Sequence, residues 1–273
     1  MDLRVRGLND LELSIKERNK KCYTFNGLDN NILSFGKGST AAHYKFNHIY
    51  DEKATNDHVA EGVIQFQSEV CRQALLFYGQ TGSGKTFTMS GAAWKKDGLL
   101  QKYLEKLAKL VREGDEYASY GEVRLSMVQI YQSEVKDLFK PFFKPYKKPE
   151  ITSIDAQYAD DTKSMITIEG ATHIDVTERL AADDIKSVMK VVNNGLDRRK
   201  VRDTFQNDTS SRSHLIFNVY YTKVWKSYYR EECRQTFVDL AGQERVSRIS
   251  REPKLYKEAI FINESLLCLC RNF

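Results

Sequence analysis

Proline, histidine and cysteine are scarce in this sequence, and long apolar runs are missing. Four prolines and 15 glycines among 273 residues exclude a collagen-like or low-complexity chain. No run approaches the roughly 18 apolar residues of a membrane-spanning helix, and no hydrophobic segment of a secretory signal opens the chain. Hydrophobic residues, at 41%, and aromatic residues, at 11%, are too frequent for a disordered chain. The sequence therefore predicts a folded protein, and its length suits one large α/β domain.

Histidine and cysteine also lack the spacings of a metal site. The five histidines include no helical H-x-x-x-H pair, and the five cysteines include no C-x-x-C pair. We therefore expect no zinc site, and we expect the thiols of a reduced intracellular protein, buried or inert. The excess of 42 basic over 37 acidic residues gives a net charge of +5, which suits an acidic partner such as a nucleotide or an acidic protein surface.

Short apolar strands alternate with amphipathic helices along the chain. Apolar residues recur at spacings of three and four within 58–73, 99–111 and 183–199, which predicts three helices. Strands are expected at 3–6, 46–50, 74–78, 123–130, 214–221 and 237–240. This alternation indicates an α/β fold with a central, largely buried sheet.

A glycine-rich segment directly follows the strand expected at 74–78. Gly79-Gln80-Thr81-Gly82-Ser83-Gly84-Lys85-Thr86 matches G-x-x-x-x-G-K-[ST]. Its glycines let backbone N–H groups converge on phosphate oxygens, and the following helix directs the positive end of its dipole at the same anion. We expect Lys85 to reach the β- and γ-phosphates of a nucleotide and the hydroxyl of Thr86 to ligate Mg²⁺.

Two further polar segments carry groups that nucleotide hydrolysis needs. Val238-Asp239-Leu240-Ala241-Gly242-Gln243-Glu244 places an Asp at the end of an apolar strand, where P-loop proteins hold Mg²⁺, and Gly242 can offer an unobstructed N–H to the γ-phosphate. Asn207-Asp208-Thr209-Ser210-Ser211-Arg212-Ser213-His214 is a hydroxyl-rich loop before an alternating strand. Such a loop can place one hydroxyl on the metal and another polar group on the attacking water, but a solvated, serine-rich turn has the same composition.

In this order, the three motifs resemble those of the kinesin motor domain. Residues 207–214 match every fixed position of that family's switch I, N-x-x-S-S-R-S-H, and residues 239–244 match its switch II, D-L-A-G-x-E. Ile262-Asn263-Glu264-Ser265-Leu266 resembles the start of the switch-II helix, which lies on tubulin. The resemblance runs from residue 3 to 273. It implies a P-loop NTPase fold whose central, mixed, mostly buried sheet carries helices on both faces.

The resemblance also implies an ATPase that uses ATP and Mg²⁺. Ser211 would complete the Mg²⁺ coordination begun by Thr86 and Asp239, while Asn207 and Ser210 would position the attacking water. The nucleotide itself would contact Arg4, Arg6, Gly79, Gln80, Thr81, Gly82, Ser83, Gly84, Lys85, Thr86 and Phe87.

The same resemblance assigns the two switches a mutual contact. Arg212 and Glu244 would form the salt bridge that marks the closed state, with Gly242 beside the γ-phosphate. Release of both loops after hydrolysis would then tilt the tubulin-binding helix.

The implied partner is the microtubule, which places the protein in the cytoplasm on the cytoskeleton. Microtubules are acidic, so a basic cluster after switch II could hold them. This cluster comprises Arg245, Arg248, Arg251, Lys254 and Lys257. Asn263 and the Lys140–Lys148 loop are further candidate contacts, although solvated loop charge would explain the loop equally well. We expect no nucleic-acid partner and no membrane partner.

The sequence departs from the family pattern in places. Gly7 replaces a Pro that forms one wall of the adenine pocket, and Glu264 stands where a Lys is common, which predicts weaker binding of the base and of the microtubule. The chain stops at Phe273, inside the switch-II helix, without the last helices, the last sheet strand and the neck linker. We therefore expect residues 1–273 to form a single motor domain of marginal stability that does not step by itself.

Several functions stay open at this point. An ATP-dependent motor that couples hydrolysis to microtubule-based movement fits the motifs best. The alternative is a non-motile, nucleotide-dependent microtubule-binding relative. A third function is a small GTPase, which would need an N/T-K-x-D motif to recognise guanine. The two segments most similar to this motif, Asn19-Lys20-Lys21-Cys22 and Thr162-Lys163-Ser164-Met165, both lack the Asp.

Overall fold

The computed structural model divides the chain into two compact units, Met1–Val63 and Ile64–Phe273. The structure describes residues 1–6, 23–26, 31–35, 41–66, 71–91, 97–131, 134–140, 156–158, 166–168, 170–200, 212–243 and 260–267. Among these residues, no helix has the length and apolar character needed to cross a membrane.

The described residues of the first unit form short strands and one helix. Its elements are β1 (Leu3–Arg4), β2 (Tyr23–Asn26), β3 (Ile32–Phe35), β4 (Ala42–Lys45), β5 (Ile49–Tyr50) and α2 (Asn56–Val63). Strands β2, β3 and β4 pair antiparallel in that order, whereas β1 pairs parallel with β5. The strands expected at 3–6 and 46–50 are thus present in shortened form.

The second unit is organised around a mixed sheet with the strand order β11-β7-β12-β13-β6, with β8 paired to β7. Its strands are β6 (Arg72–Phe77), β7 (Ala118–Tyr131), β8 (Glu134–Asp137), β11 (Ile174–Asp175), β12 (His214–Trp225) and β13 (Arg230–Asp239), and a separate pair is formed by β9 (Ala156–Tyr158) and β10 (Ile166–Ile168). Strand β6 runs parallel to β13, and the other pairs are antiparallel. Within the described residues, β6 has β13 as its sole ladder partner.

Alternation along β12 builds the centre of this sheet. Leu215, Phe217 and Val219 are fully buried, as period-2 patterning predicts. The same row continues to Lys223, which is only 2% exposed. Its ammonium lies 3.8 Å from the centroid of the Trp225 ring, and burial lowers the pKa of Lys223. The aromatic ring of Trp225 therefore accommodates the charge of Lys223 at the end of this buried row of side chains.

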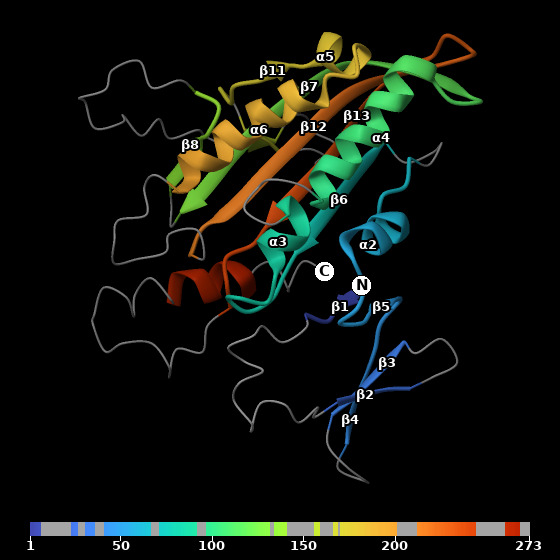
Figure 1. The fold of residues 1–273 in the computed structure, drawn as a ribbon. Coiled ribbons are helices and arrows are strands. Elements are labelled where there is room, and N and C mark those ends of the chain that lie inside the picture. The colour runs from blue at the N-terminus through green and yellow to red at the C-terminus, as the bar shows by residue number, and fades with distance from the viewer. Residues whose placement is uncertain are drawn as a thin grey trace. The chain divides into compact units, whose positions relative to one another are not determined.

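Helices cover both faces of the sheet, as expected. The second unit's helices are α3 (Lys85–Ser90), α4 (Leu99–Glu113), α5 (Thr177–Ala181) and α6 (Ile185–Lys200), and α4 and α6 lie over the same face (Figure 1). Phe237 of β13 points to that face, because its ring centroid lies 5.5 Å from that of Tyr103 in α4. Val238, the next residue, points to the other face and packs against the cluster of Ile262 and Leu266. These two belong to a helical segment at residues 260–267.

Two sequence-based expectations are wrong. The helix expected at 58–73 ends at Val63, and Phe66 instead stacks its ring on Tyr103, with centroids 4.7 Å apart. The cysteines are not all unpaired, because the structure joins Cys71 to Cys233. Both differences arise from long-range packing that periodicity and spacing do not encode.

Candidate functional site

The glycine-rich segment 79–86 forms the turn between β6 and α3. Gly84 caps the helix with φ of +98°, a left-handed conformation that favours glycine. The Lys85 ammonium donates hydrogen bonds to the carbonyl oxygens of Gly79 and Gln80, each at 2.9 Å. The lysine therefore lies along the turn that the motif predicts will hold phosphates.

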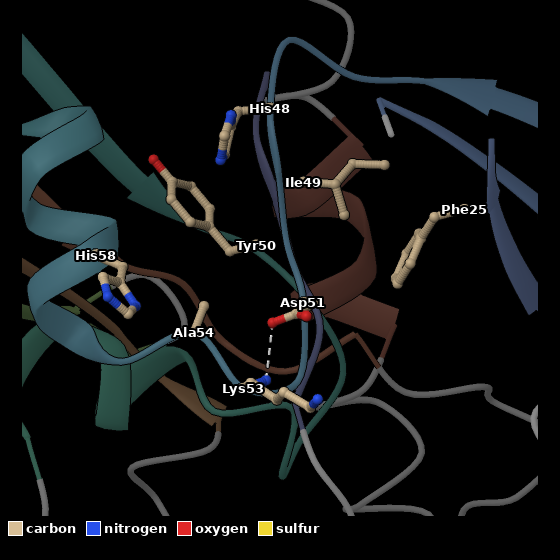
Figure 2. A pocket seen from close by; sticks show the side chains of 8 residues that line it. All are labelled: Phe25, His48, Ile49, Tyr50, Asp51, Lys53, Ala54 and His58. Carbon is tan, nitrogen blue, oxygen red and sulfur yellow. Dashed lines mark hydrogen bonds between the residues drawn. The ribbon is translucent and has the colours of Figure 1, made fainter. Parts of the chain in front are cut away.

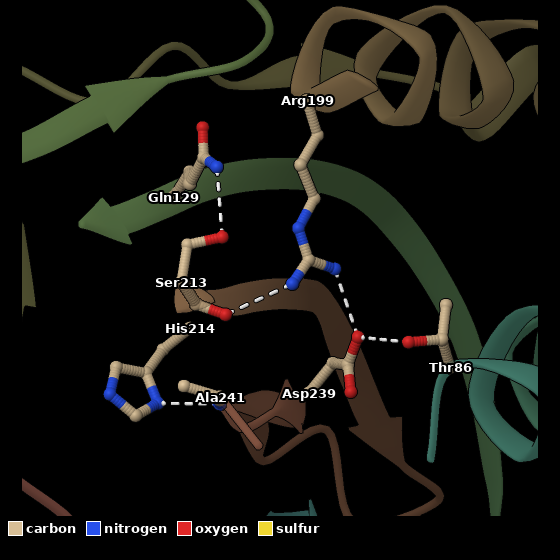
Figure 3. Close-up of polar contacts among 7 residues, drawn as sticks. All are labelled: Thr86, Gln129, Arg199, Ser213, His214, Asp239 and Ala241. Carbon is tan, nitrogen blue, oxygen red and sulfur yellow. Dashed lines mark hydrogen bonds and ion pairs between the residues drawn. The ribbon is translucent and has the colours of Figure 1, made fainter. Parts of the chain in front are cut away.

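Asp239, the last residue of β13, lies beside this turn. Its Oδ2 accepts hydrogen bonds from Thr86 Oγ1 at 2.7 Å and from Arg199 Nη1 at 2.9 Å (Figure 3). Arg199 is fully buried and Asp239 is 1% exposed, so the two charges form a buried ion pair. The second guanidinium nitrogen, Nη2, donates to Ser213 O at 3.0 Å. Asp239 thus joins the P-loop to α6, and Arg199 extends the connection to the residue before β12.

The other carboxylate oxygen of Asp239 fits a metal. Oδ1 is buried and accepts no hydrogen bond from the described residues. A buried carboxylate oxygen without a partner is costly, and it is relieved by a metal ion or by a water bound to one. With the hydroxyl of Thr86 beside it, the donor set is all oxygen, which Mg²⁺ prefers. These residues therefore fit the expected Mg²⁺ and the nucleotide that carries it.

Gly242 contacts the P-loop closely. A Cβ added there would lie 2.0 Å from Thr81 Oγ1 and 3.0 Å from Thr81 N, so any larger residue would require Thr81 to move. The next residue, Gln243, donates its backbone N–H to Gly79 O at 3.3 Å and accepts the Tyr78 hydroxyl on Oε1 at 2.5 Å. The start of switch II is therefore held directly against the phosphate-binding turn.

His214 connects this region to the helical segment 260–267. The Ala241 N–H donates to His214 Nδ1 at 3.1 Å, which leaves the ring proton on Nε2, 3.0 Å from Ser265 Oγ (Figure 3 shows the first bond). Ser265 in turn donates to Ile262 O at 2.7 Å. Burial, and next the positive charge of Arg199, lower the pKa of His214. The neutral ring therefore bridges the end of switch I, switch II and the helical segment.

The structure brings together the core of the predicted site. Lys85, Thr86, Asp239 and Gly242 converge with the rest of the turn, and Phe87 is 48% exposed on α3. Arg212 precedes Ser213 and is half-buried. Outside the described residues lie Asn207, Ser210, Ser211, Glu244, Arg245, Arg248, Arg251, Lys254, Lys257 and most of the Lys140–Lys148 loop. Asn263 is half-buried within the helical segment.

Two predicted nucleotide contacts belong to the first unit. Arg4 donates hydrogen bonds to Asn56 Oδ1 and to Ala54 O, the latter at 3.2 Å, and burial lowers the pKa of Arg4. Arg6 is exposed. Arg4 is thus held at the start of α2.

A separate hollow of about 420 Å³ lies within the first unit (Figure 2). It is lined by Phe25, His48, Ile49, Tyr50, Asp51, Lys53, Ala54 and His58. Two of these residues are joined by a hydrogen bond, because the Lys53 N–H donates to Asp51 Oδ1 at 2.9 Å. None of the predicted site residues lines this hollow.

Sequence reasoning missed Arg199, the ion-pair partner of Asp239. The apolar stripe of α6 contains Val192 and Leu196, and Arg199 follows Leu196 by one further turn on the same face. A charged residue on a buried helix face needs a buried partner, and this was the available signal. Gln129, whose Nε2 donates to Ser213 Oγ at 2.9 Å, gave no comparable signal.

Removal of Arg199 should expose the cost of the buried Asp239 charge. We expect Arg199→Ala to lower the free energy of unfolding by about 3–5 kcal/mol, because one buried charge remains uncompensated. Urea titration measures the change. Lys190→Ala, at an exposed position of the same helix, should change it by less than about 0.5 kcal/mol. Adding Asp239→Asn to Arg199→Ala should recover part of the loss, and strict additivity of the two substitutions would contradict the ion pair.

The lowered pKa of His214 predicts acid sensitivity. In the unfolded chain the His214 imidazole takes up a proton with an ordinary pKa near 6.5, whereas in the folded chain it does so only at lower pH. Acid therefore favours unfolding. The free energy of unfolding should therefore fall as pH drops below about 6.5, and fall less in His214→Gln. Denaturant titrations at pH 7.5 and 5.5 measure this. Substitution of the exposed His58 by Gln provides a control. If the free energy of unfolding fell equally with pH in the wild type and in His214→Gln, the lowered pKa of His214 would not be the cause.

The family model and the relatives that match this chain all belong to one family. A family model for the kinesin motor domain matches residues 4–272. Kinesin-like protein KIN-14I of Oryza sativa subsp. japonica is 30% identical and Kinesin-related protein 5 of Dictyostelium discoideum is 29% identical, each over 97% of this chain. The matches cover 20% and 26% of those proteins, so the chain spans about a fifth to a quarter of their length.

Solved structures show the same fold. A KIF14 dimer with AMP-PNP in complex with a microtubule aligns with a TM-score of 0.78 at 23% identity, over 98% of this chain and 74% of that one. The motor domain of the Kar3-like kinesin from Ashbya gossypii aligns with a TM-score of 0.69 at 23% identity, over 98% of this chain and 77% of that one.

Proposed function

The chain belongs to the kinesin motor-domain family, and from that premise we propose that it is an ATP-driven microtubule motor domain. The observation that carries the proposal is the convergence of the segment that contains Asp239 and Gly242 on the sequence-distant P-loop. Thr86 contacts Asp239 at 2.7 Å, and a Cβ added at Gly242 would lie 2.0 Å from Thr81 Oγ1. The relatives are kinesins, which favours a motor over a non-motile nucleotide-dependent binder.

ATP is the proposed substrate, bound by the turn at 79–86. Its backbone N–H groups and the Lys85 ammonium would hold the phosphates, with Lys85 exchanging its two carbonyl partners for phosphate oxygens. Mg²⁺, held by Thr86, Ser211 and Asp239, would neutralise charge on the phosphates. The chain's own contribution is positioning and electrostatic stabilisation.

The switch loops supply the remaining proposed roles. Asn207 and Ser210 would orient the attacking water, and the Gly242 N–H would donate to the γ-phosphate. Arg212 and Glu244 would pair when both loops close. On the base side, Arg4, Arg6 and Phe87 would line the adenine.

The coupling to the microtubule is proposed to run through the helical segment 260–267. Leu240 and Ala241 of switch II share one buried cluster with Ile262 and Leu266. His214 adds a polar link to Ser265. A displacement of switch II by the γ-phosphate would therefore be passed to this segment.

The microtubule face is proposed to include Asn263 and the basic cluster of Arg245, Arg248, Arg251, Lys254 and Lys257. The Lys140–Lys148 loop is a further candidate. This partner would place the protein on the cytoplasmic cytoskeleton. We propose that the two compact units together make up one motor domain over residues 1–273.

Lys85→Ala tests the assignment of the nucleotide site. We expect ATP hydrolysis to fall by at least about a hundredfold, because a charge on the transferred phosphate loses its cation. Microtubule binding should remain, since Lys85 lies in the phosphate-binding turn. Phosphate release and co-sedimentation measure the two properties. Lys109→Ala, an exposed lysine of α4, serves as the matched control, and a Lys85→Ala protein that hydrolyses ATP normally would show that the site is assigned wrongly.

A further inference from the structure

Two cysteines that the nucleotide site does not use meet where β6 begins beside β13. The structure joins Cys71 to Cys233 with Cα atoms 4.3 Å apart, although 162 residues separate them in sequence. The Arg234 N–H donates to Cys71 O at 2.6 Å, at the start of the β6–β13 ladder. The backbone therefore holds the two cysteines side by side independently of any bond between their sulfur atoms.

This position matters because of what the two strands carry at their other ends. Strand β6 leads into the P-loop and β13 ends at Asp239. Strand β6 pairs with β13 in parallel, from Arg72 opposite Arg234 to Phe77 opposite Asp239. We propose that Cys71 and Cys233 are a thiol oxidation site whose reversible disulfide clamps the P-loop strand to the sheet.

The two sulfur atoms differ in access, which sets the order of the chemistry. Cys71 is partly exposed, whereas Cys233 is fully buried. A small-molecule disulfide, such as oxidised glutathione, is the oxidant. The Cys71 thiolate attacks one of its sulfurs and expels a first glutathione thiolate. Cys233 then attacks Cys71 Sγ and expels the second, so two protons and two electrons leave the protein and two glutathione thiols form.

A third group defines the competing possibility. Glu231 lies two residues before Cys233, on the same face of β13. Its carboxylate and the two sulfur atoms all lie within 4.8 Å of one another. Two thiolates and a carboxylate also form a donor set for Zn²⁺. The Glu231 carboxylate, however, accepts a hydrogen bond from Trp225 Nε1 at 3.2 Å, which occupies one of its oxygens. This contact favours the disulfide.

Thiol mapping of the folded 273-residue chain tests the proposal. After incubation with oxidised glutathione, alkylation and digestion without reductant, we expect a peptide that links Cys71 to Cys233 and is released by dithiothreitol. The oxidised protein should melt roughly 10 °C higher, because a long loop is closed in the unfolded chain. Cys71→Ser, at the partly exposed position, should abolish both effects. Cys22→Ser should preserve both.

Three results would overturn the proposal. Cys71 and Cys233 could both remain free thiols after oxidation, or Cys71 could stop at the glutathione adduct without a cross-link. The reduced chain, given zinc chloride alone, could bind one equivalent that Cys71→Ser loses and then resist oxidation, which would make the site a metal site. All readouts are thiol counts, metal content and melting temperatures, so the proposed ATPase function is tested separately.

Discussion

The buried carboxylate of Asp239 is the constraint on which the rest of the site depends. It is 1% exposed, and a charge at that depth requires partners. Arg199 supplies the opposite charge from α6, and Thr86 supplies a hydroxyl from α3. The carboxylate thereby fixes the positions of two helices relative to the end of β13. Its second oxygen, Oδ1, remains available for the oxygen-coordinated metal that a nucleotide brings.

The residues after Asp239 extend this constraint through their backbone. The N–H groups of Leu240, Ala241 and Gln243 donate respectively to Phe77 O, to the His214 ring and to Gly79 O. Three donors from one short loop thus reach the P-loop strand, the start of β12 and the phosphate-binding turn. A ligand that moves this loop must break or replace these bonds, and the loop shares a buried cluster with Ile262 and Leu266. The site and the helical segment are therefore mechanically linked.

Local features of the site could be predicted from the sequence, and long-range ones could not. The strand–turn–helix around Lys85 and the Asp at the end of β13 are encoded within a few residues. The close approach of Gly242 to Thr81 is not, because it joins distant segments of the chain. The partners Arg199, Ser265 and Cys233 lie far along the chain from Asp239, His214 and Cys71, and spacing does not encode such pairs. The fold class followed from alternating strands and helices. The early end of α2 could not be predicted from this pattern, because it depends on the packing of Phe66 against Tyr103 of α4.

Amide hydrogen exchange with and without Mg²⁺-ATP tests the central claim most directly. That claim is that nucleotide at the P-loop acts on the segment 260–267 through the loop after Asp239. The account predicts slower exchange at residues 240–243 when nucleotide binds, together with a changed exchange rate across 260–267. Protection confined to the P-loop, with both other segments unchanged, would contradict it.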